Sequence, residues 1–187
     1  MDWNCIDIPP VFHSELTGAR FEHCCKCNCN VLTDASGVYQ VEKAFRDGQL
    51  LYEYALCERC LEWYYGSLSD QSVQHMDEFI AQRVDFDGRH SLLSALSPTR
   101  VEPWIDRCLI TGKPIKEKDE YQLLAHCAGE QLIMVHTPLA MSGDPVDEIL
   151  GLLSKESVEQ MDRFVRDYLR VPPELLKSSK ERRRLMQ

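Results

Sequence analysis

Apolar residues recur at helical spacing in two segments of this chain that lie 85 residues apart. In 66–84 they stand at Val73, Met76, Phe79, Ile80 and Val84, and the aligned segment 151–169 has apolar residues at the same places. A spacing of three or four residues puts such side chains on one face of a helix. Ser69 and Ser154 stand where a helix N-cap is expected. The pattern therefore predicts two amphipathic helices that begin alike.

The two segments also share residues that an amphipathic helix does not require. Eight of the nineteen aligned positions are identical, and they include Gly66 and Gly151, both capping serines, and Asp77 and Asp162. An apolar stripe alone would not reproduce these matches. We therefore interpret the segments as products of an internal duplication.

A pair of strand-like runs precedes each predicted helix. In the first half, VYQVEKAF and QLLYEYALC flank Arg46-Asp47-Gly48, and Asp-Gly is a favoured hairpin turn. In the second half, EYQLLAHC and QLIMVH flank Ala128-Gly129-Glu130. The expected fold class is α+β, with two tandem pseudo-repeats that each place a β-hairpin before helices.

These repeats divide the chain into five segments. The expected order is an N-terminal extension (1–20), a first repeat (21–85), a linker rich in Gly, Ser and Pro (86–103), a second repeat (104–172) and a basic C-terminal tail (173–187). The tail has two open interpretations, an arm for an acidic partner or a solvated terminus, and composition favours the second.

Four cysteines flank the first predicted hairpin as two pairs, Cys24-x2-Cys27 and Cys57-x2-Cys60. Two cysteines three residues apart can bind one metal ion from a tight turn. A second such pair then completes a tetrahedron of four thiolates around the same ion. Such a ligand set is closed, which favours a structural ion over a catalytic one. We expect Cys24, Cys27, Cys57 and Cys60 to bind zinc.

Other cysteines keep alternatives to this ligand set open. Cys25 or Cys29 could replace one of the four ligands, and Cys27 with Cys29 is one alternative pair. Six thiolates could also hold a multi-metal or copper(I) cluster, because soft ligands suit both. His23, beside the first pair, is interpreted as a neighbour of the site.

The order of cysteine turn, hairpin and two further ligands at a helix start resembles the treble-clef, zinc-ribbon-like type of zinc module. The resemblance covers residues 21–65. It implies a structural zinc ion and no particular activity, because many unrelated families share this module. Asn28 follows the second cysteine of the turn, where a left-handed backbone is expected.

The second repeat has lost most of these ligands. Thr111, Ser142 and Pro145 stand at the positions of Cys27, Cys57 and Cys60, and only Cys108 keeps its place. His126, Cys127 and His136 are possible ligand types, but they lie on predicted strands without paired spacing, where adjacent residues point to opposite faces. We expect the first repeat to bind zinc and the second, degenerate repeat to be metal-free and held by hydrophobic packing.

Charge and composition restrict the partners and the compartment. The net charge is −9, and since 177–187 carries a local balance of +4, the rest of the chain carries −13. An acidic body repels phosphate backbones, which disfavours nucleic acid as a partner. The N-terminus resembles no secretory signal, no apolar run is long enough for a membrane span, and clustered thiols fit the reducing cytoplasm.

These observations predict a non-enzymatic, zinc-stabilised interaction module that binds a protein partner. The sequence has no phosphate-binding loop, no Gly-x-Ser-x-Gly elbow and no His-Glu-x2-His helix. A thiol or zinc redox switch is the alternative, because Cys25, Lys26 and Cys29 crowd the site. A metal-dependent enzyme is the third hypothesis, and the oligomeric state is not predicted.

Overall fold

The computed structural model describes residues 4–33, 37–116, 119–169 and 171. Its strands are β1 (Cys5–Asp7), β2 (Val38–Arg46), β3 (Gln49–Cys57), β4 (Tyr121–Ala128), β5 (Gln131–Ile133) and β6 (Leu139–Ser142). Its helices are α1 (Glu58–Gly66), α2 (Asp70–Ala81), α3 (Phe86–Leu96), α4 (Glu102–Ile105), α5 (Gly143–Leu150) and α6 (Lys155–Phe164), with short helical turns η1 (Pro10–Phe12) and η2 (Val165–Leu169). The expected mixture of helices and antiparallel strands is confirmed. The basic tail predicted at 173–187 lies outside the described residues.

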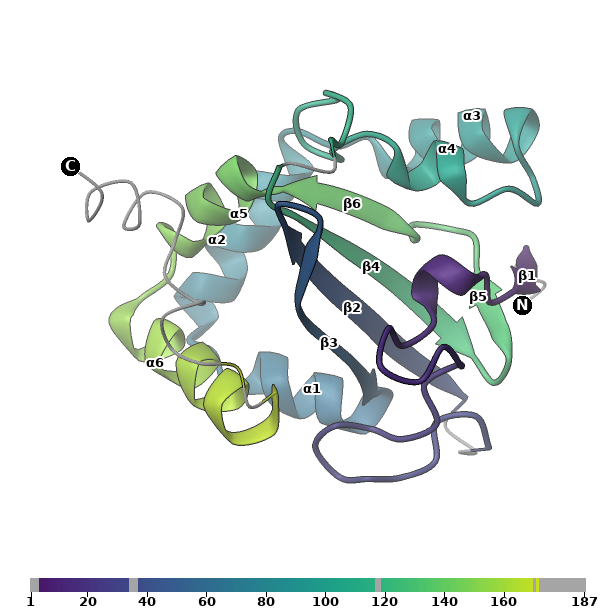
Figure 1. The fold of residues 1–187 in the computed structure, drawn as a ribbon. Helices are drawn as coiled ribbons and strands as arrows, with labels where there is room; N and C mark the ends of the chain where they lie inside the picture. Colours follow the sequence, from purple (N-terminus) through teal and green to yellow (C-terminus); the bar gives the residue numbers. More distant parts are fainter. Residues whose placement is uncertain (1–3, 34–36, 117–118, 170, 172–187) are drawn as a thin grey trace.

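All six strands belong to one antiparallel sheet in the order β1-β5-β4-β2-β3, and β6 also pairs with β4. The middle of the sheet is the β2–β4 pair, in which Val41 faces Ala125 and Glu42 faces Leu124. The two predicted hairpins therefore do not form separate sheets. Each contributes its first strand to a common centre (Figure 1). Within the described ranges, no helix is long and apolar enough to cross a membrane.

The first hairpin forms as the sequence predicts. β2 and β3 pair from Tyr39–Cys57 to Arg46–Gln49, and the turn is made by Asp47 and Gly48. Both turn residues have positive φ angles, 51° and 73°. Two successive residues with positive φ give the turn whose twist matches that of a hairpin, and Asp-Gly tolerates this conformation well.

The second hairpin differs from the prediction, because its outer strand is interrupted. The run QLIMVH was expected to form one strand, but β5 ends at Ile133 and pairing with β4 resumes only at β6. In the interruption, Thr137 Oγ1 accepts a hydrogen bond from the His126 backbone N–H at 3.0 Å. The next residue, Pro138, has no N–H to give to a strand ladder. His136, expected on a strand, therefore lies in a loop.

The segment predicted to be a linker contains helix α3 and the start of α4 (Figure 1). Arg89 of α3 donates hydrogen bonds to the carbonyl oxygens of Trp104 (2.7 Å) and Pro138 (2.9 Å), and its guanidinium lies 5.0 Å from the Trp104 ring centre. Burial lowers the pKa of Arg89 to about 10. These contacts fix α3 against the loop before β6, while the division into domains stays a prediction.

One face of the sheet is covered by the N-terminal segment, drawn in purple in Figure 1. Lys43 of β2 is completely buried there. Its ammonium donates to the His13 carbonyl at 2.7 Å and pairs with Glu15 at 2.8 Å and Glu53 at 3.6 Å. Burying a charge is costly unless it is paired and hydrogen-bonded. These partners satisfy the ammonium and hold the N-terminal segment on the sheet.

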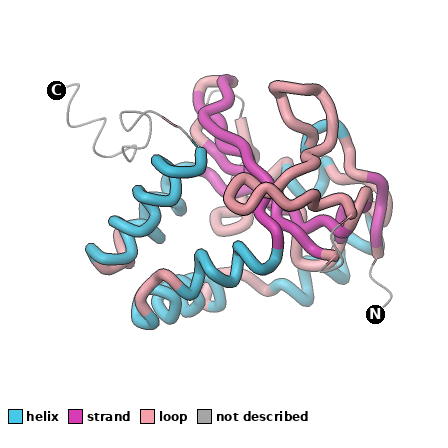
Figure 2. Tube along the Cα trace, turned by 90° about the horizontal axis from the view of Figure 1, so that it is seen from below, coloured by secondary structure: helices cyan, strands magenta, loops and turns pink. Residues whose placement is uncertain are grey.

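The opposite face is covered by helices, and Figure 2 shows helices along one side of the strands and much of the loop structure on the other. Glu42 accepts hydrogen bonds there from the hydroxyls of Tyr52 (3.1 Å) and Tyr54 (2.5 Å). Gln122 of β4 donates to Tyr52 at 2.9 Å, and the Tyr54 ring meets the edge of Phe164. Burial raises the pKa of Glu42. This polar network connects β2, β3, β4 and α6.

The predicted helix caps are both present, and they contact each other. Ser69 caps α2 by accepting from the Ser72 N–H, and Ser154 caps α6 by accepting from the Ser157 N–H. The backbone N–H of Ser69 then donates to Ser157 Oγ, and that of Ser154 donates to Ser72 Oγ, both at 2.9 Å. Each helix start therefore satisfies a backbone donor of the other.

Ser72→Ala and Ser157→Ala should each destabilise the protein by about 1–2 kcal/mol, because each leaves a backbone N–H of the other helix start without an acceptor. Urea unfolding of both variants, followed by circular dichroism, measures this loss. Ser91→Ala, at an exposed position of α3, is the matched control and should leave the midpoint unchanged. Buried-serine variants that unfold at the wild-type midpoint would contradict the role of the paired caps.

Candidate metal centre

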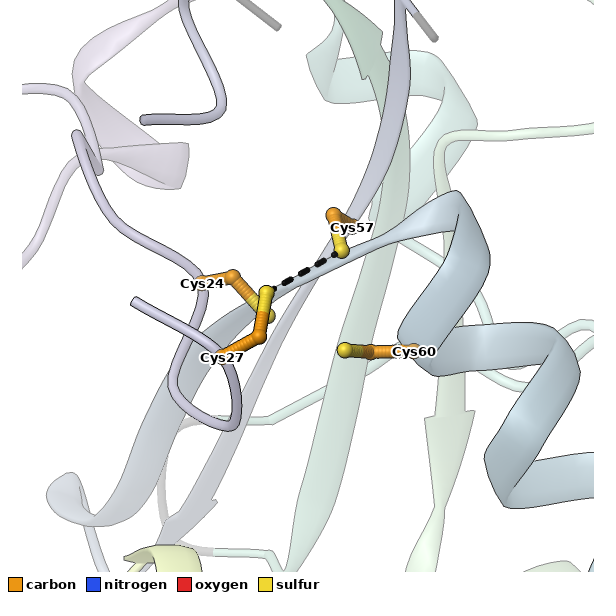
Figure 3. Close-up of side chains that lie close together, drawn as sticks. All are labelled: Cys24, Cys27, Cys57 and Cys60. Carbon is orange, nitrogen blue, oxygen red and sulfur yellow. Dashed lines mark hydrogen bonds between the residues drawn. The ribbon is translucent and has the colours of Figure 1, made fainter. Parts of the chain in front are cut away.

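The structure brings together Cys24, Cys27, Cys57 and Cys60, whose sulfur atoms all lie within 4.8 Å of one another (Figure 3). The Cys27 and Cys57 sulfurs are 3.7 Å apart. A tetrahedral zinc ion with Zn–S bonds of about 2.3 Å separates its sulfur ligands by about 3.8 Å. The cluster therefore has the dimensions of a four-thiolate site for one metal ion.

A tight turn positions the first cysteine pair. The Asn28 N–H donates to the Cys24 carbonyl and the Cys24 N–H donates to the Cys29 carbonyl, both at 2.9 Å. Asn28 has a φ of 59°, which confirms the left-handed conformation expected there. The Cys25 N–H donates to the carbonyl of Ala55 at 2.8 Å and attaches the turn to β3. This bond brings the first pair to the end of the strand where the second pair begins.

The end of β3 and the start of α1 position the second pair. Cys57 is both the last residue of β3 and the N-cap of α1, and Cys60 lies in the first turn of that helix. The free N–H groups of a helix start favour negative charge nearby. Cys24, Cys57 and Cys60 are buried, whereas Cys27 is exposed. The candidate site therefore has three enclosed thiols and one at the surface.

The hydrogen bonds and burial of the four thiols affect their pKa values differently. A hydrogen bond from the Cys25 side chain lowers the pKa of Cys24 to about 3. Burial raises the pKa of Cys57 and of Cys60. Burial also opposes ionisation of Cys27, but hydrogen bonds from the backbone and side chain of Cys29 lower its pKa overall.

Four thiolates this close together repel one another strongly unless a cation lies between them. A bound metal ion supplies that positive charge and deprotonates the thiols that coordinate it. The donor set of four sulfur atoms therefore fits a soft or borderline metal ion.

Two cations lie beside the cluster, and only one of them contacts a ligand sulfur. Arg59, between Cys57 and Cys60 in sequence, places Nη2 3.9 Å from the Cys27 sulfur. Lys26 instead places its ammonium 4.0 Å from the Trp63 ring centre and 5.6 Å from that of Tyr168. From the sequence, Lys26 is among the residues expected to crowd the site, and Arg59 is given no role. The position of Arg59 inside the second cysteine pair was the available signal.

The remaining residues near the first pair lie beside the four-sulfur cluster. The Cys25 side chain hydrogen-bonds to Cys24, and the Cys29 side chain hydrogen-bonds to Cys27 and Cys57. His23 is exposed and forms a backbone bridge with Asn30. Neither Cys25 nor Cys29 belongs to the group of four sulfurs that are mutually close.

The second half repeats the backbone hydrogen bonds of the cysteine turn, with Cys108 as its one cysteine. The Gly112 N–H donates to the Cys108 carbonyl and the Cys108 N–H to the Lys113 carbonyl, both at 2.9 Å. The Leu109 N–H donates to the carbonyl of Ala140 at 2.8 Å, and this bond corresponds to the one from the Cys25 N–H to the carbonyl of Ala55. Gly112 has a φ of 65°, matching Asn28. The two turns thus have the same hydrogen bonds 84 or 85 residues apart.

Cys108 is the one cysteine of this second turn, and it contacts Ser142 and Thr111. The Ser142 N–H lies 3.4 Å from the Cys108 sulfur. Burial opposes ionisation, but hydrogen bonds from Ser142 and Thr111 lower the pKa of Cys108 overall. Pro145, at the position of Cys60, is buried.

The other ligand types of the second half lie apart from this turn. Cys127 is buried in β4 beside Tyr39, and burial raises its pKa to about 12. His126 is on the same strand, and burial together with the neighbouring His136 lowers its pKa. In the described part of the chain, neither histidine belongs to a group of three or more ligand side chains.

Comparisons of this chain with protein-family models, with curated proteins and with solved structures found no match. The chemistry of the cysteine cluster and of its surroundings is therefore the basis for a functional proposal.

Replacing Cys57 by Ser removes one ligand, so the variant should lose the bound metal that the wild-type protein carries. The measurement is the intact mass under native conditions, before and after acid denaturation, with one ion expected per wild-type chain. Cys5→Ser is the control, because Cys5 lies on β1 outside the cluster, and it should keep the ion. Full metal content in the Cys57 variant would contradict this assignment.

Proposed function

We propose that Cys24, Cys27, Cys57 and Cys60 hold one structural zinc ion, and that the chain is a non-enzymatic module that binds a protein partner. The observation that carries this proposal is the closed set of four sulfur atoms with the spacing of a tetrahedral site. Zinc is favoured because it commonly takes four thiolates in this geometry. Once four thiolates are bound, a tetrahedral ion has no position left for a substrate or a reactive water.

Zinc would join the cysteine turn to the strand–helix junction of the first half. Cys24 and Cys27 lie on a loop that contacts β3 through the Cys25–Ala55 hydrogen bond, while Cys57 and Cys60 lie at the strand–helix junction. Structural zinc sites commonly contribute about 10 kcal/mol or more to folding. The ion would therefore fix the loop against α1 and keep the surface around them rigid.

We also propose that the two halves are tandem pseudo-repeats of the treble-clef type, the second of them degenerate. The matching turns at Cys24 and Cys108 support this proposal, because their hydrogen bonds correspond one for one. The paired caps of α2 and α6 support it too. The order of elements is also the one expected of a treble clef: a turn with the first ligand pair, then a hairpin, then a helix that begins at the second ligand pair.

The surface next to the zinc site offers a place for a protein partner. Trp63 and Tyr65 of α1 expose 46% and 44% of their area. Tyr65 lines a shallow, open depression together with Asp70, Val73, Gln74, Asp77 and Glu78 of α2. Exposed aromatic residues are common in interfaces. The carboxylates around the Tyr65 ring favour a partner segment that carries Lys or Arg side chains.

The zinc-loaded chain should enrich a partner from an extract of its source cells, and Tyr65→Ala should then weaken that interaction by about tenfold or more. Isothermal titration with the purified partner measures the change. Leu92→Ala is the matched control, because Leu92 is an exposed apolar residue on α3 and should leave the affinity unchanged.

Metal content has to be equal in all three proteins for this comparison to be valid. Two results would count against the proposal: no protein enriched by the zinc-loaded chain, or a partner that binds the Tyr65 variant as tightly as the wild type.

Restoring the missing ligands tests the pseudo-repeat directly. A triple variant should create a second metal site, because the second turn has the same backbone hydrogen bonds as the first. The variant combines Thr111→Cys, Ser142→Cys and Pro145→Cys with the native Cys108. Native mass spectrometry should then count two ions per chain. The matched control adds Cys108→Ser to this variant and should hold fewer ions. A folded triple variant that binds a single ion would contradict the structural equivalence of the halves.

A further inference from the structure

We propose that Cys27 and Cys29 form a peroxide-sensitive pair: a hydroperoxide oxidises Cys27, and Cys29 closes a disulfide with it that releases the metal. This inference rests on the proposed zinc site and adds its regulation. The observation that carries it is the position of a partly exposed thiol outside the ligand set two residues from the exposed ligand. Cys29 and Cys27 are separated by Asn28 alone, which turns the chain with a φ of 59°.

Solvent exposure decides which ligand a peroxide reaches first. Cys24, Cys57 and Cys60 expose 1%, 2% and 4% of their area, whereas Cys27 is exposed. Susceptibility of a cysteine to oxidation follows its thiolate character and its exposure. A ligand sulfur is a thiolate, and the Arg59 guanidinium lies 3.9 Å from it. Cys27 is therefore the ligand open to attack.

Position and distance make Cys29 the thiol that can close the disulfide. Residues two apart in sequence have Cα atoms at most about 7 Å apart, and disulfides need about 4.4–6.8 Å. Asn28, between the two cysteines, has a φ of 59°, so the chain turns tightly there. The Cys24 N–H donates to the Cys29 carbonyl at 2.9 Å, which holds Cys29 at the end of the same tight turn that carries Cys24 and Cys27.

Cys25 provides the internal comparison. It is also partly exposed and outside the ligand set, but its side chain contacts Cys24, which is almost completely buried. A peroxide molecule has no access to Cys24 in the folded protein. Cys25 is therefore expected to stay a neutral neighbour of its ligand and to form no disulfide.

The chemistry balances with hydrogen peroxide as the oxidant. The Cys27 thiolate attacks one peroxide oxygen, the O–O bond breaks, and with one proton from solvent the products are a sulfenic acid and water. The Cys29 thiol then attacks the Cys27 sulfur, the S–S bond forms, and the oxygen leaves as a second water. Two cysteines are oxidised and one peroxide is reduced. Cys27 can no longer bind the metal, so three ligands remain.

The test uses the full zinc-loaded chain, whose metal is counted before any treatment. After hydrogen peroxide, a chromogenic chelator measures released zinc, and peptide mapping of the alkylated protein locates disulfides. Wild type should release its ion and show a Cys27–Cys29 disulfide, and dithiothreitol with added zinc should restore the starting state. Cys25→Ser should behave like wild type.

Cys29→Ser should form no such disulfide, because the sulfurs that remain beside Cys27, such as that of Cys57 at 3.7 Å, are held on the metal as ligands. That acid should oxidise further to the sulfinate, which dithiothreitol does not reduce. We expect at least about tenfold less zinc to be recovered by this variant than by wild type after peroxide and reduction. Its metal content before peroxide shows that the site itself is intact.

Three results would overturn the inference: zinc retained by wild type under peroxide, a disulfide elsewhere in the cluster, or full recovery of the Cys29 variant. If the chain holds no zinc before treatment, that result contradicts the proposed structural zinc ion and leaves the thiol pair to be tested on its own. In that case the disulfide map alone decides the matter, since a Cys27–Cys29 bond supports the thiol pair and its absence refutes it.

Discussion

The pairing of β2 with β4 is the interaction on which the rest of the architecture depends. These two strands come from opposite halves of the chain and pair along the whole of β4, from Val38–Ala128 to Phe45–Tyr121. Their pairing places both hairpins in one sheet and both sets of helices on the same side of it. The starts of α2 and α6 can then meet. It also gives β3 a fixed outer position, against which the cysteine turn closes.

The elements predicted correctly from sequence are those specified by neighbouring residues. Asp47 and Gly48 determine the first turn, Ser69 and Ser154 determine two helix starts, and the spacing of the cysteines within each pair reflects the local turn that carries it. In each case the residue that gives the signal also makes the interaction. The four-sulfur cluster could be foreseen because one hairpin brings its two pairs together.

The features that could not be predicted depend on contacts between distant segments. Nothing in VYQVEKAF indicates that it pairs with β4, because any half-buried strand shows similar alternation. Lys43 and Glu42 look like solvent-exposed positions in the sequence, yet segments from both ends of the chain cover them. The interruption before β6 depends on the Thr137–His126 hydrogen bond, which replaces a ladder bond across the sheet.

The paired caps of α2 and α6 make a self-complementary contact, in which each helix start gives and receives the same hydrogen bond. Interfaces of this kind normally hold two identical subunits together about a two-fold axis. Here the contact lies within one chain, and it connects the half that has the cysteine cluster to the half that lacks it. Neither helix start can open without leaving the other unsatisfied. A contact of this kind couples the opening of one half to that of the other, so the half without the cysteine cluster is expected to unfold together with the half that has it.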